Sequence, residues 1–489
     1  MEISIILYAV LKLYLILNIY QQSHYHIKAY FKHFILNFVF YDLIPLVLLI
    51  LGIVLDHVFI QVICSIYLIC FGILYVFTRL HLNVTKRIIY LIVLSILYII
   101  GIFFIPHVNL YLLLLIEFMI IPILYLEKFI SYILNLKYIK EAKNKIFSYM
   151  GNIIAITGSA GKTSTKHLLN QALNLYKPTS STPKSFNTPL GISMFLNNTN
   201  VNMYDNLVLE FGISKVNDMF KLKELVPPNI AFITDIGYMH METFKDINIL
   251  IKEKLSILDG TYKAVVNYDS EYIRSNINYN GILITYGFEY GDYNARNINN
   301  GTFDVYYKNE YLDTFKCNLI GKYQILNLLG VIAYIHSEGY NLDILKRGML
   351  LFKGVPNRLE IKKHNKITII DDSYNSNYKG FIDALNVLKN SRGKRFLLTP
   401  GIVELGKYKK EIYEALADNI LLSTDVVILI GYFQTRILYS LLKDTNLEVY
   451  VLHNFKEAYD FFLELSKKYD ECSLLIENDV PDLYRIGLI

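Results

Sequence analysis

Long apolar runs fill the first 130 residues and alternate with short polar segments. Five of them, at roughly 3–20, 38–55, 58–78, 88–105 and 109–126, have about the length of a membrane-spanning helix, because about 20 residues are needed to cross a hydrocarbon core of about 30 Å. Lys12 lies in the middle of the first run, so four spans remain an alternative to five. The pattern therefore predicts an all-α transmembrane helical region over 1–147 that ends in a basic connector.

Basic side chains gather in three of the segments that separate or follow these runs. They lie within 21–37, 79–87 and 127–147, whereas the other two loops hold little beyond Asp56, His57, Pro106 and His107. Positive charge favours the cytoplasmic side of a membrane. We therefore expect an integral inner (cytoplasmic) membrane protein, with the N-terminus outside and the soluble domains in the cytoplasm.

Charge is distributed unevenly along the chain. The first 145 residues contain 11 Lys and Arg against 6 Asp and Glu, and the rest contains 37 of each. A neutral second part gives no electrostatic reason to expect nucleic acid as a partner, whereas the basic first part suits membrane lipid. Glu117 lies inside the fifth run, where a carboxyl group is either functional or a hydrogen-bonded structural group.

The pattern changes after Asn152 to that of an α/β domain. A short apolar strand pattern at 153–156 runs into TGSAGKTST (157–165) and then into a helix pattern that ends near Leu175. Glycines let backbone N–H groups surround phosphate oxygens, the helix N-terminus adds its dipole, the lysine reaches the β- and γ-phosphates, and the threonine can ligate Mg²⁺. We therefore predict ATP and Mg²⁺ as cofactors, bound by Gly158, Ser159, Ala160, Gly161, Lys162, Thr163 and Ser164.

This loop is shorter than the usual P-loop and resembles that of the Mur ligase family. Other segments that resemble the family are SFNTPLG (185–191), LVLEFGIS (207–214), PNIAFITDIGYMHME (228–242), IKEK (251–254), GKYQILN (321–327) and VPNRLE (355–360). The segments DDSYNSN (371–377) and GIVELG (401–406) indicate the branch that adds D-alanyl-D-alanine to UDP-N-acetylmuramoyl-tripeptide.

The resemblance covers residues 150–489 and has three departures. Tyr323 stands where a histidine is common in the family, and Tyr378 stands where a proline is usual. Where family members have a domain that holds the UDP end of the substrate, this chain has its apolar runs. The third departure matters most for the identity of the substrate, because the missing domain is the one that holds the UDP end.

The resemblance implies an ATP-dependent acid–amino-acid ligase that works through an acyl phosphate. Lys162 and Thr163 would serve the phosphates, and Glu210 and His240 would hold a second Mg²⁺. Lys254 stands where family members carry a carbamylated lysine, with Lys252 as the alternative if the register differs. The expected catalytic set is therefore Lys162, Lys254, His240 and Asp372.

Residues further along the chain complete the site that the resemblance implies. Asn327 and Arg358 would contact the nucleotide, and Asp372 would hold its ribose or orient Arg358. The substrate residues would be Asn187, Thr188, Tyr374, Asn375 and Asn377. Each has a plain structural alternative, since asparagine is a good turn former and a carboxylate at a strand end is often a helix cap.

The second part of the chain is expected to hold two α/β domains. A P-loop central domain covers 148–352, with an antiparallel patch over 281–318, and a Rossmann-like C-terminal domain covers 353–489. In the latter, buried strand patterns at 367–370, 395–398, 426–429, 448–452 and 473–476 alternate with helix patterns, which predicts a mostly parallel sheet.

The function that this sequence favours is the ligation of D-alanyl-D-alanine, or another amino compound, to a cell-wall peptide precursor that is soluble or lipid-linked. A membrane transport or signalling ATPase and a non-catalytic nucleotide-binding scaffold remain alternatives. A plain ATPase has no reason to carry DDSYNSN and GIVELG, and a silent scaffold has no reason to keep Lys162, Glu210 and His240.

Overall fold

The computed structural model describes residues 2–22, 84–104, 116–374, 377–402 and 405–478, with isolated positions between 25 and 82. The apolar runs predicted at 38–55 and 58–78 therefore lie almost wholly outside the described residues. The chain divides into two compact units, Met1–Asn135 with Pro481–Ile489, and Leu136–Val480.

The first unit contains the helices α1 (Glu2–Gln22) and α5 (Lys86–Phe103) and the start of α6 (Ile116–Phe147). Apolar side chains such as Leu17, Leu91 and Ile120 form its buried core. Among the described residues, one helical segment, Phe118–Phe147, has the length and apolar character to cross a membrane, and Arg87–Gly101 is a shorter apolar helix. The number of spans and the orientation stay predictions.

A buried carboxyl group links the helices of this unit. Glu127 accepts hydrogen bonds from Arg87 Nε at 2.5 Å and Nη2 at 2.9 Å, and from Ser131 and Tyr20. The guanidinium group of Arg87 also lies 3.7 Å from the centre of the Tyr25 ring. Arg87 is therefore a paired helix residue rather than a free loop charge.

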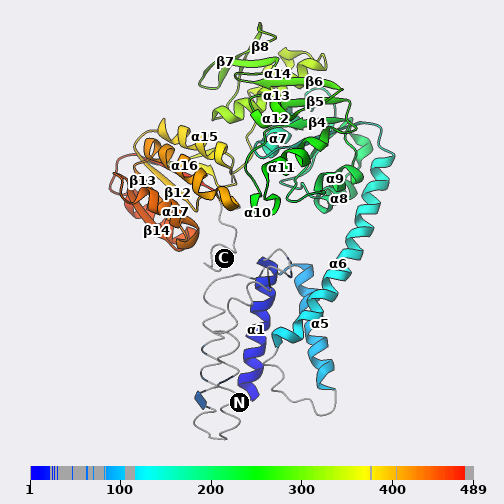
Figure 1. Cartoon of the computed structure of the whole chain (residues 1–489), viewed down its shortest axis with the longest axis vertical. Helices are drawn as coiled ribbons and strands as arrows, with labels where there is room; N and C mark the ends of the chain where they lie inside the picture. Colours follow the sequence, from blue (N-terminus) through cyan, green and yellow to red (C-terminus); the bar gives the residue numbers. More distant parts are fainter. Residues whose placement is uncertain are drawn as a thin grey trace. The chain divides into compact units, whose positions relative to one another are not determined.

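The second unit begins with a nine-stranded sheet of order β2-β3-β1-β4-β5-β6-β7-β8-β9 (Figure 1). The strands β1 to β6 run parallel, and β7 also pairs in parallel with β6. Of the antiparallel patch predicted for 281–318, only β7, β8 and β9 pair in antiparallel fashion, and β6 belongs to the parallel part. Their bounds are β1 (Asn152–Thr157), β2 (Thr179–Ser181), β3 (Asn206–Glu210), β4 (Ile230–Ile233), β5 (Lys263–Asn267), β6 (Ile282–Gly287), β7 (Tyr293–Asn299), β8 (Thr302–Tyr307) and β9 (Glu310–Lys316).

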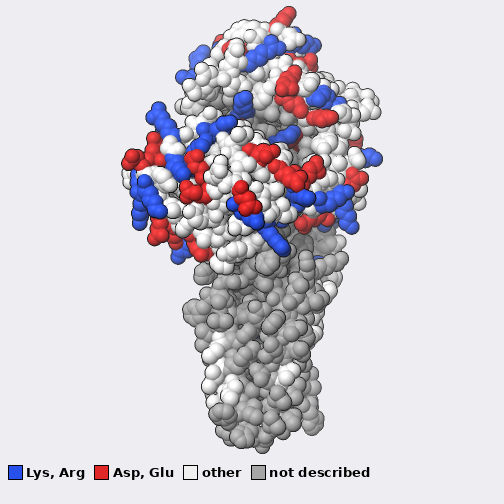
Figure 2. Space-filling view, turned by 60° about the vertical axis from the view of Figure 1, so that its left-hand side comes forward, with Lys and Arg blue, Asp and Glu red and all other residues white. Residues whose placement is uncertain are grey.

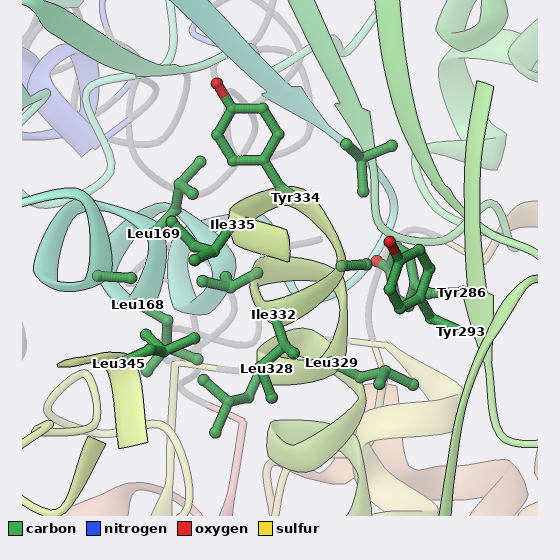
Figure 3. Packing of buried hydrophobic residues seen from close by; sticks show 14 of the residues in the cluster. Leu168, Leu169, Tyr286, Tyr293, Leu328, Leu329, Ile332, Tyr334, Ile335 and Leu345 are labelled. Atoms are coloured by element: carbon green, nitrogen blue, oxygen red, sulfur yellow. The ribbon is translucent and has the colours of Figure 1, made fainter. Parts of the chain in front are cut away.

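Alternate residues of β1 point to opposite faces of this sheet and so define two cores. Ile154 and Ile156 pack with α7 (Lys162–Leu173), α13 (Lys322–Ser337) and α14 (Leu342–Met349). Figure 3 shows the side chains of α13 at the centre of this core, among Leu168 and Leu169 of α7 and Leu345 of α14. The opposite core, around Ile153 and Ala155, includes α8 (Pro189–Asn198), α9 (Asp218–Leu225), α10 (Met241–Phe244), α11 (Ile247–Leu255) and α12 (Glu271–Asn276).

A six-stranded sheet of order β10-β11-β15-β12-β13-β14 forms the C-terminal lobe. Its bounds are β10 (Glu360–His364), β11 (Ile367–Asp372), β12 (Lys394–Thr399), β13 (Val426–Ile430), β14 (Glu448–Leu452) and β15 (Cys472–Glu477). The five predicted strands are present and parallel, and β10 is an added antiparallel edge. The helices are α15 (Tyr378–Lys389), α16 (Lys409–Ser423), α17 (Tyr432–Leu442) and α18 (Phe455–Ser466).

The predicted basic connector is the second half of α6. Ala142 and Ile146 are buried in the core that also contains α8. Lys145 Nζ donates to the carbonyl oxygens of Leu196 at 3.1 Å and Asn197 at 2.7 Å. The last carbonyls of a helix lack the N–H partners of a following turn, so Lys145 caps the C-terminus of α8, where the Thr199 N–H also donates to the Leu196 carbonyl at 3.3 Å.

The surface of the second unit carries mixed charge. Figure 2 shows Lys and Arg interspersed with Asp and Glu over the visible face, without a large area of one sign. This distribution agrees with the balanced count in the sequence.

Candidate active site

The glycine-rich loop between β1 and α7 is held in place by its neighbours. Gly161 has φ 78°, and a Cβ atom there would collide with the side chain of Asn327. The Ser159 N–H donates to Asp235 O at 2.7 Å, and Ser159 Oγ donates to Gly237 O at 2.9 Å. The loop therefore has a fixed shape, with the free N–H groups at the start of α7 available to an anion.

A cavity of about 610 Å³ lies in front of this loop. Its walls contain many of the predicted site residues, which come from both lobes of the second unit. From the prediction they include Ser159, Ala160, Gly161, Lys162, Thr163, Ser164, Asn187, Thr188, Glu210, His240, Arg358, Tyr374 and Asn377. The sequence motifs thus converge on one space, although they are spread over more than 200 positions.

Two lysines share one acceptor beneath the loop. Lys162 Nζ and Lys254 Nζ each donate to the carbonyl oxygen of Gly158 at 2.8 Å. Burial, followed by the charge of Lys162, places the pKa of Lys254 well below its ordinary value. A lowered pKa favours the neutral amine, which is the form that can add carbon dioxide, but carbamylation of Lys254 stays a prediction.

Glu210 lies at the end of β3 and is almost fully buried. Its carboxylate accepts from Thr163 Oγ1 at 2.9 Å and from Asn187 Nδ2 at 3.1 Å, and Lys166 Nζ lies 3.2 Å away. Burial alone would raise the pKa of Glu210, but the charges of Lys166 and Lys162 and these hydrogen bonds hold it below its ordinary value. The group is therefore an ionised carboxylate facing the loop.

The donor atoms of this region suit Mg²⁺. Thr163 and Glu210 offer oxygen atoms 2.9 Å apart, and His240 lines the same cavity. Mg²⁺ commonly takes one or two protein oxygens and completes its shell with water and phosphate. The described residues contain no group of three or more His, Cys, Asp or Glu side chains placed to hold a metal by themselves. The residues here therefore suit a Mg²⁺ ion that is bound together with phosphate.

Two predicted residues lie in a smaller hollow beside the main cavity. Asn327 and Asp372 line it, together with Tyr323 and Arg358. Asp372 Oδ1 accepts from the Leu359 N–H at 3.0 Å, directly after Arg358. This contact fits the prediction that Asp372 orients the segment that carries Arg358.

The predicted substrate residues have different surroundings. Thr188 caps α8 by accepting from the Gly191 N–H at 3.2 Å, and Asn377 caps α15 by accepting from the Gly380 N–H at 2.9 Å. Both contacts are ordinary helix N-caps, which is the structural alternative to a substrate role, although both residues also line the cavity. Tyr374 is exposed, with its ring 5.4 Å from the Arg358 guanidinium group. Asn375 lies outside the described residues.

Sequence reasoning missed several buried charges at the site. Lys166 contacts Glu210, and Asp235 pairs with Lys379 of α15 at 2.9 Å. Glu477 is a buried residue of β15 in register with Asp372 of β11. Of these, only Lys166 had a signal in the sequence, since it follows Lys162 by one helical turn.

Comparison with known proteins identifies the family. A UDP-N-acetylmuramoyl-tripeptide–D-alanyl-D-alanine ligase from Borreliella burgdorferi is 30% identical over 330 residues, which are 64% of this chain and 68% of that protein. The family descriptions "Mur ligase middle domain" and "Mur ligase, glutamate ligase domain" match residues 156–335 and 357–475. The chain belongs to the Mur ligase family. It is an ATP-dependent amide ligase.

Further Mur ligases resemble parts of the chain. A ligase of the same name from Escherichia coli is 28% identical over 52% of this chain and 58% of its own length. Solved structures of MurF from Acinetobacter baumannii and of MurF ligase from Thermotoga maritima in complex with ADP both give a TM-score of 0.63. The Acinetobacter protein is 22% identical and the match spans 72% of this chain and 79% of that protein. The Thermotoga protein is 21% identical and the match spans 72% of this chain and 82% of that protein. At these identities the likeness to solved structures shows the Mur ligase fold.

Proposed function

We propose that this protein joins the amine of D-alanyl-D-alanine to a carboxyl group of a peptidoglycan precursor peptide. The observation that carries the proposal is the single cavity that joins the glycine-rich loop, Glu210, His240 and Arg358. The relatives from Borreliella burgdorferi and Escherichia coli carry the name of this activity.

The proposed reaction has two steps. An oxygen of the substrate carboxylate attacks the γ-phosphorus of ATP, so that an acyl phosphate forms and ADP leaves. The amine then attacks the acyl carbon, and an amide bond forms. The phosphate that leaves keeps the carboxylate oxygen that bonded to phosphorus in the first step. Both steps need phosphate charge to be neutralised and the reacting atoms to be aligned.

Residues around the loop would meet the charge requirement. Lys162 would leave the Gly158 carbonyl for the phosphates, while the N–H groups at the start of α7 donate to them. Thr163, Glu210 and His240 would hold Mg²⁺, which when bound would offset the negative charge of the phosphates and the carboxylate. Lys254 stays beneath the loop, where it supports Gly158 or, if carbamylated, orients the metal through water.

Residues of the C-terminal lobe would close the site. Arg358 lines both the cavity and the adjoining hollow, so it can reach the nucleotide. Tyr374 also lines the cavity, where it would contact the incoming amine. Closure of this side would exclude water, which otherwise hydrolyses an acyl phosphate.

The test is ATP turnover by the full chain in detergent with Mg²⁺. We expect turnover that requires both the carboxyl substrate and D-alanyl-D-alanine, together with a product that contains the new amide. Turnover that ignores every amine would contradict the ligase proposal and favour a membrane ATPase.

We further propose that the chain is an integral membrane protein with cytoplasmic soluble domains, and that its carboxyl substrate is lipid-linked. The support is the apolar first unit, in which α6 exposes Tyr125, Phe129, Tyr132 and Leu134. Exposed apolar surface on this scale marks a membrane or protein contact. Equal turnover of a soluble UDP-linked peptide and its lipid-linked form would contradict the lipid linkage.

A further inference from the structure

A buried lysine next to Glu210 has no part in the proposed chemistry. Lys166 lies on α7, one turn after Lys162, and its side chain is 4% exposed. Its Nζ atom lies 3.2 Å from Glu210 Oε2 and donates to the carbonyl oxygen of Lys184. Taking an ammonium group out of water is unfavourable unless it is paired and hydrogen-bonded, and here both conditions are met.

Lys166 contacts the carboxylate from outside the walls of the cavity. Glu210, Thr163 and Asn187 are wall residues, and Lys166 is not one of them. The lysine therefore contacts the candidate metal ligand without itself lining the space. Its contact also ties the segment that carries Asn187 to α7 through the Lys184 carbonyl.

The charges around the cavity make the ligand-free site positive. Lys162, Lys215, Lys221 and Arg358 line the cavity and Lys166 flanks it, against two carboxylates in its walls, Glu210 and Asp218. Asp218 accepts hydrogen bonds from Ser214 and from the Lys215 N–H, and the neighbouring carboxylate of Asp235 is paired with Lys379. Positive charges therefore outnumber negative ones around the space, and charges of like sign repel. A bare divalent cation is therefore repelled, and a polyphosphate is attracted.

We propose that Lys166 is a positioning residue that neutralises Glu210, so that a divalent cation binds at this carboxylate only together with a nucleotide. In the ligand-free protein the carboxylate is satisfied by Lys166, Thr163 and Asn187. The phosphates of a nucleotide add enough negative charge to change the balance in favour of the cation. The inference rests on the metal role proposed for Glu210, and it is independent of which amine the enzyme adds.

The probe is Mn²⁺, measured by electron paramagnetic resonance as the free and bound ion with the full chain in detergent. For the unmodified protein we expect no site with millimolar or tighter affinity without nucleotide, and one site when ADP is present. Glu210→Gln should weaken the ADP-dependent site at least tenfold. A nucleotide-free site of equal affinity that Glu210→Gln removes would overturn the proposal.

The lysine itself is tested by Lys166→Met. Removing the neutralising charge should let the nucleotide-free protein bind Mn²⁺ at least tenfold more tightly than the unmodified protein does. Lys184→Met is the matched control, because it removes an exposed charge nearby and keeps the backbone carbonyl that Lys166 contacts. Equal Mn²⁺ affinity in Lys166→Met and Lys184→Met would overturn the proposal.

The possible outcomes can be told apart. If Lys166→Met does not fold, the comparison of the unmodified protein with Glu210→Gln still tests the nucleotide dependence of the site, and a nucleotide-free site that Glu210→Gln removes overturns the proposal. The proposed function is judged separately by the amide product, so an enzyme that forms the product but binds Mn²⁺ without nucleotide would refute only the role of Lys166.

Discussion

The buried lysines of the site differ in how readily sequence reveals them. Lys162 belongs to a motif whose chemistry is known from its spacing, so its place against the loop could be predicted. Lys166 follows it by four residues, but nothing in the sequence shows that its partner, Glu210, comes from a strand 44 positions away. A motif predicts the local backbone geometry. An ion pair between distant residues depends on which strands and helices lie side by side in the fold.

The environment of Lys254 makes stability depend on pH. Its pKa in the folded protein is well below 10.5, because of burial and then the charge of Lys162. Between that lowered pKa and 10.5 the unfolded chain binds more protons than the folded one, so the free energy of unfolding rises with pH through this window. Below the lowered pKa, the folded protein carries the full cost of a buried charge.

We predict that Lys254→Met removes this rise. The melting temperature of the variant, measured from pH 7 to 10 in buffers free of carbon dioxide, should change less with pH than that of the unmodified protein. Lys252→Met is the matched control, since Lys252 is exposed on the same helix. An unchanged pH dependence in Lys254→Met would show that Lys254 is fully protonated in the folded state.

At the level of elements, the sequence predicted the strands well and the connections less well. The strands of the C-terminal lobe are short buried runs of Ile, Val and Leu between helix patterns, and five of them appear close to their predicted positions. The edge strand β10 was missed because Glu360–His364 contains two lysines and no buried run. The second half of α6 was missed because its lysines suggested a lipid surface, whereas Lys145 caps α8.

A second cap joins the two lobes. Asp383 of α15 accepts from the N–H groups of Lys322 at 3.2 Å and Tyr323 at 3.0 Å, at the start of α13. These N–H groups have no partner within α13, so the cap of one lobe's helix comes from the other lobe. This pairing has no local sequence signal, because 60 positions separate Asp383 from Tyr323.

We predict that Asp383→Ala lowers the free energy of unfolding by about 0.5–2 kcal/mol, the usual cost of losing a helix N-cap. Chemical denaturation of the full chain in detergent would measure the loss. Asp460→Ala, an exposed position on α18, should change stability by less than about 0.5 kcal/mol. Equal stability of the two variants would show that Asp383 does not cap α13.

At the scale of the whole molecule, the second unit followed from its motifs, whereas the first did not. Motifs from both lobes contribute residues to one cavity, and Lys254, Asn327 and Asp372 lie beneath or beside it. The apolar runs predict only that their side chains are buried away from water. In the part of the chain that the structure describes, the Arg87–Glu127 pair adds polar contacts that a hydropathy pattern does not predict.

We predict that the full chain sediments with membranes and stays there after washing at high pH. If the apolar runs are inserted in lipid as predicted, they hold the chain in the membrane, whereas contacts made through the basic residues alone would be lost. Immunoblotting of the washed pellet and the supernatant provides the measurement. Release into the supernatant would contradict an integral membrane protein.

In the proposed reaction, ATP activates a carboxylate, which an amine then attacks. The most direct measurement uses a carboxyl substrate labelled with oxygen-18 and follows the label into the released phosphate by mass spectrometry. With D-alanyl-D-alanine present, we predict one labelled oxygen in each phosphate released, and no labelled phosphate from Lys162→Ala. Phosphate released without the label, while ATP is consumed and the substrate carboxyl keeps both labelled oxygens, would contradict it.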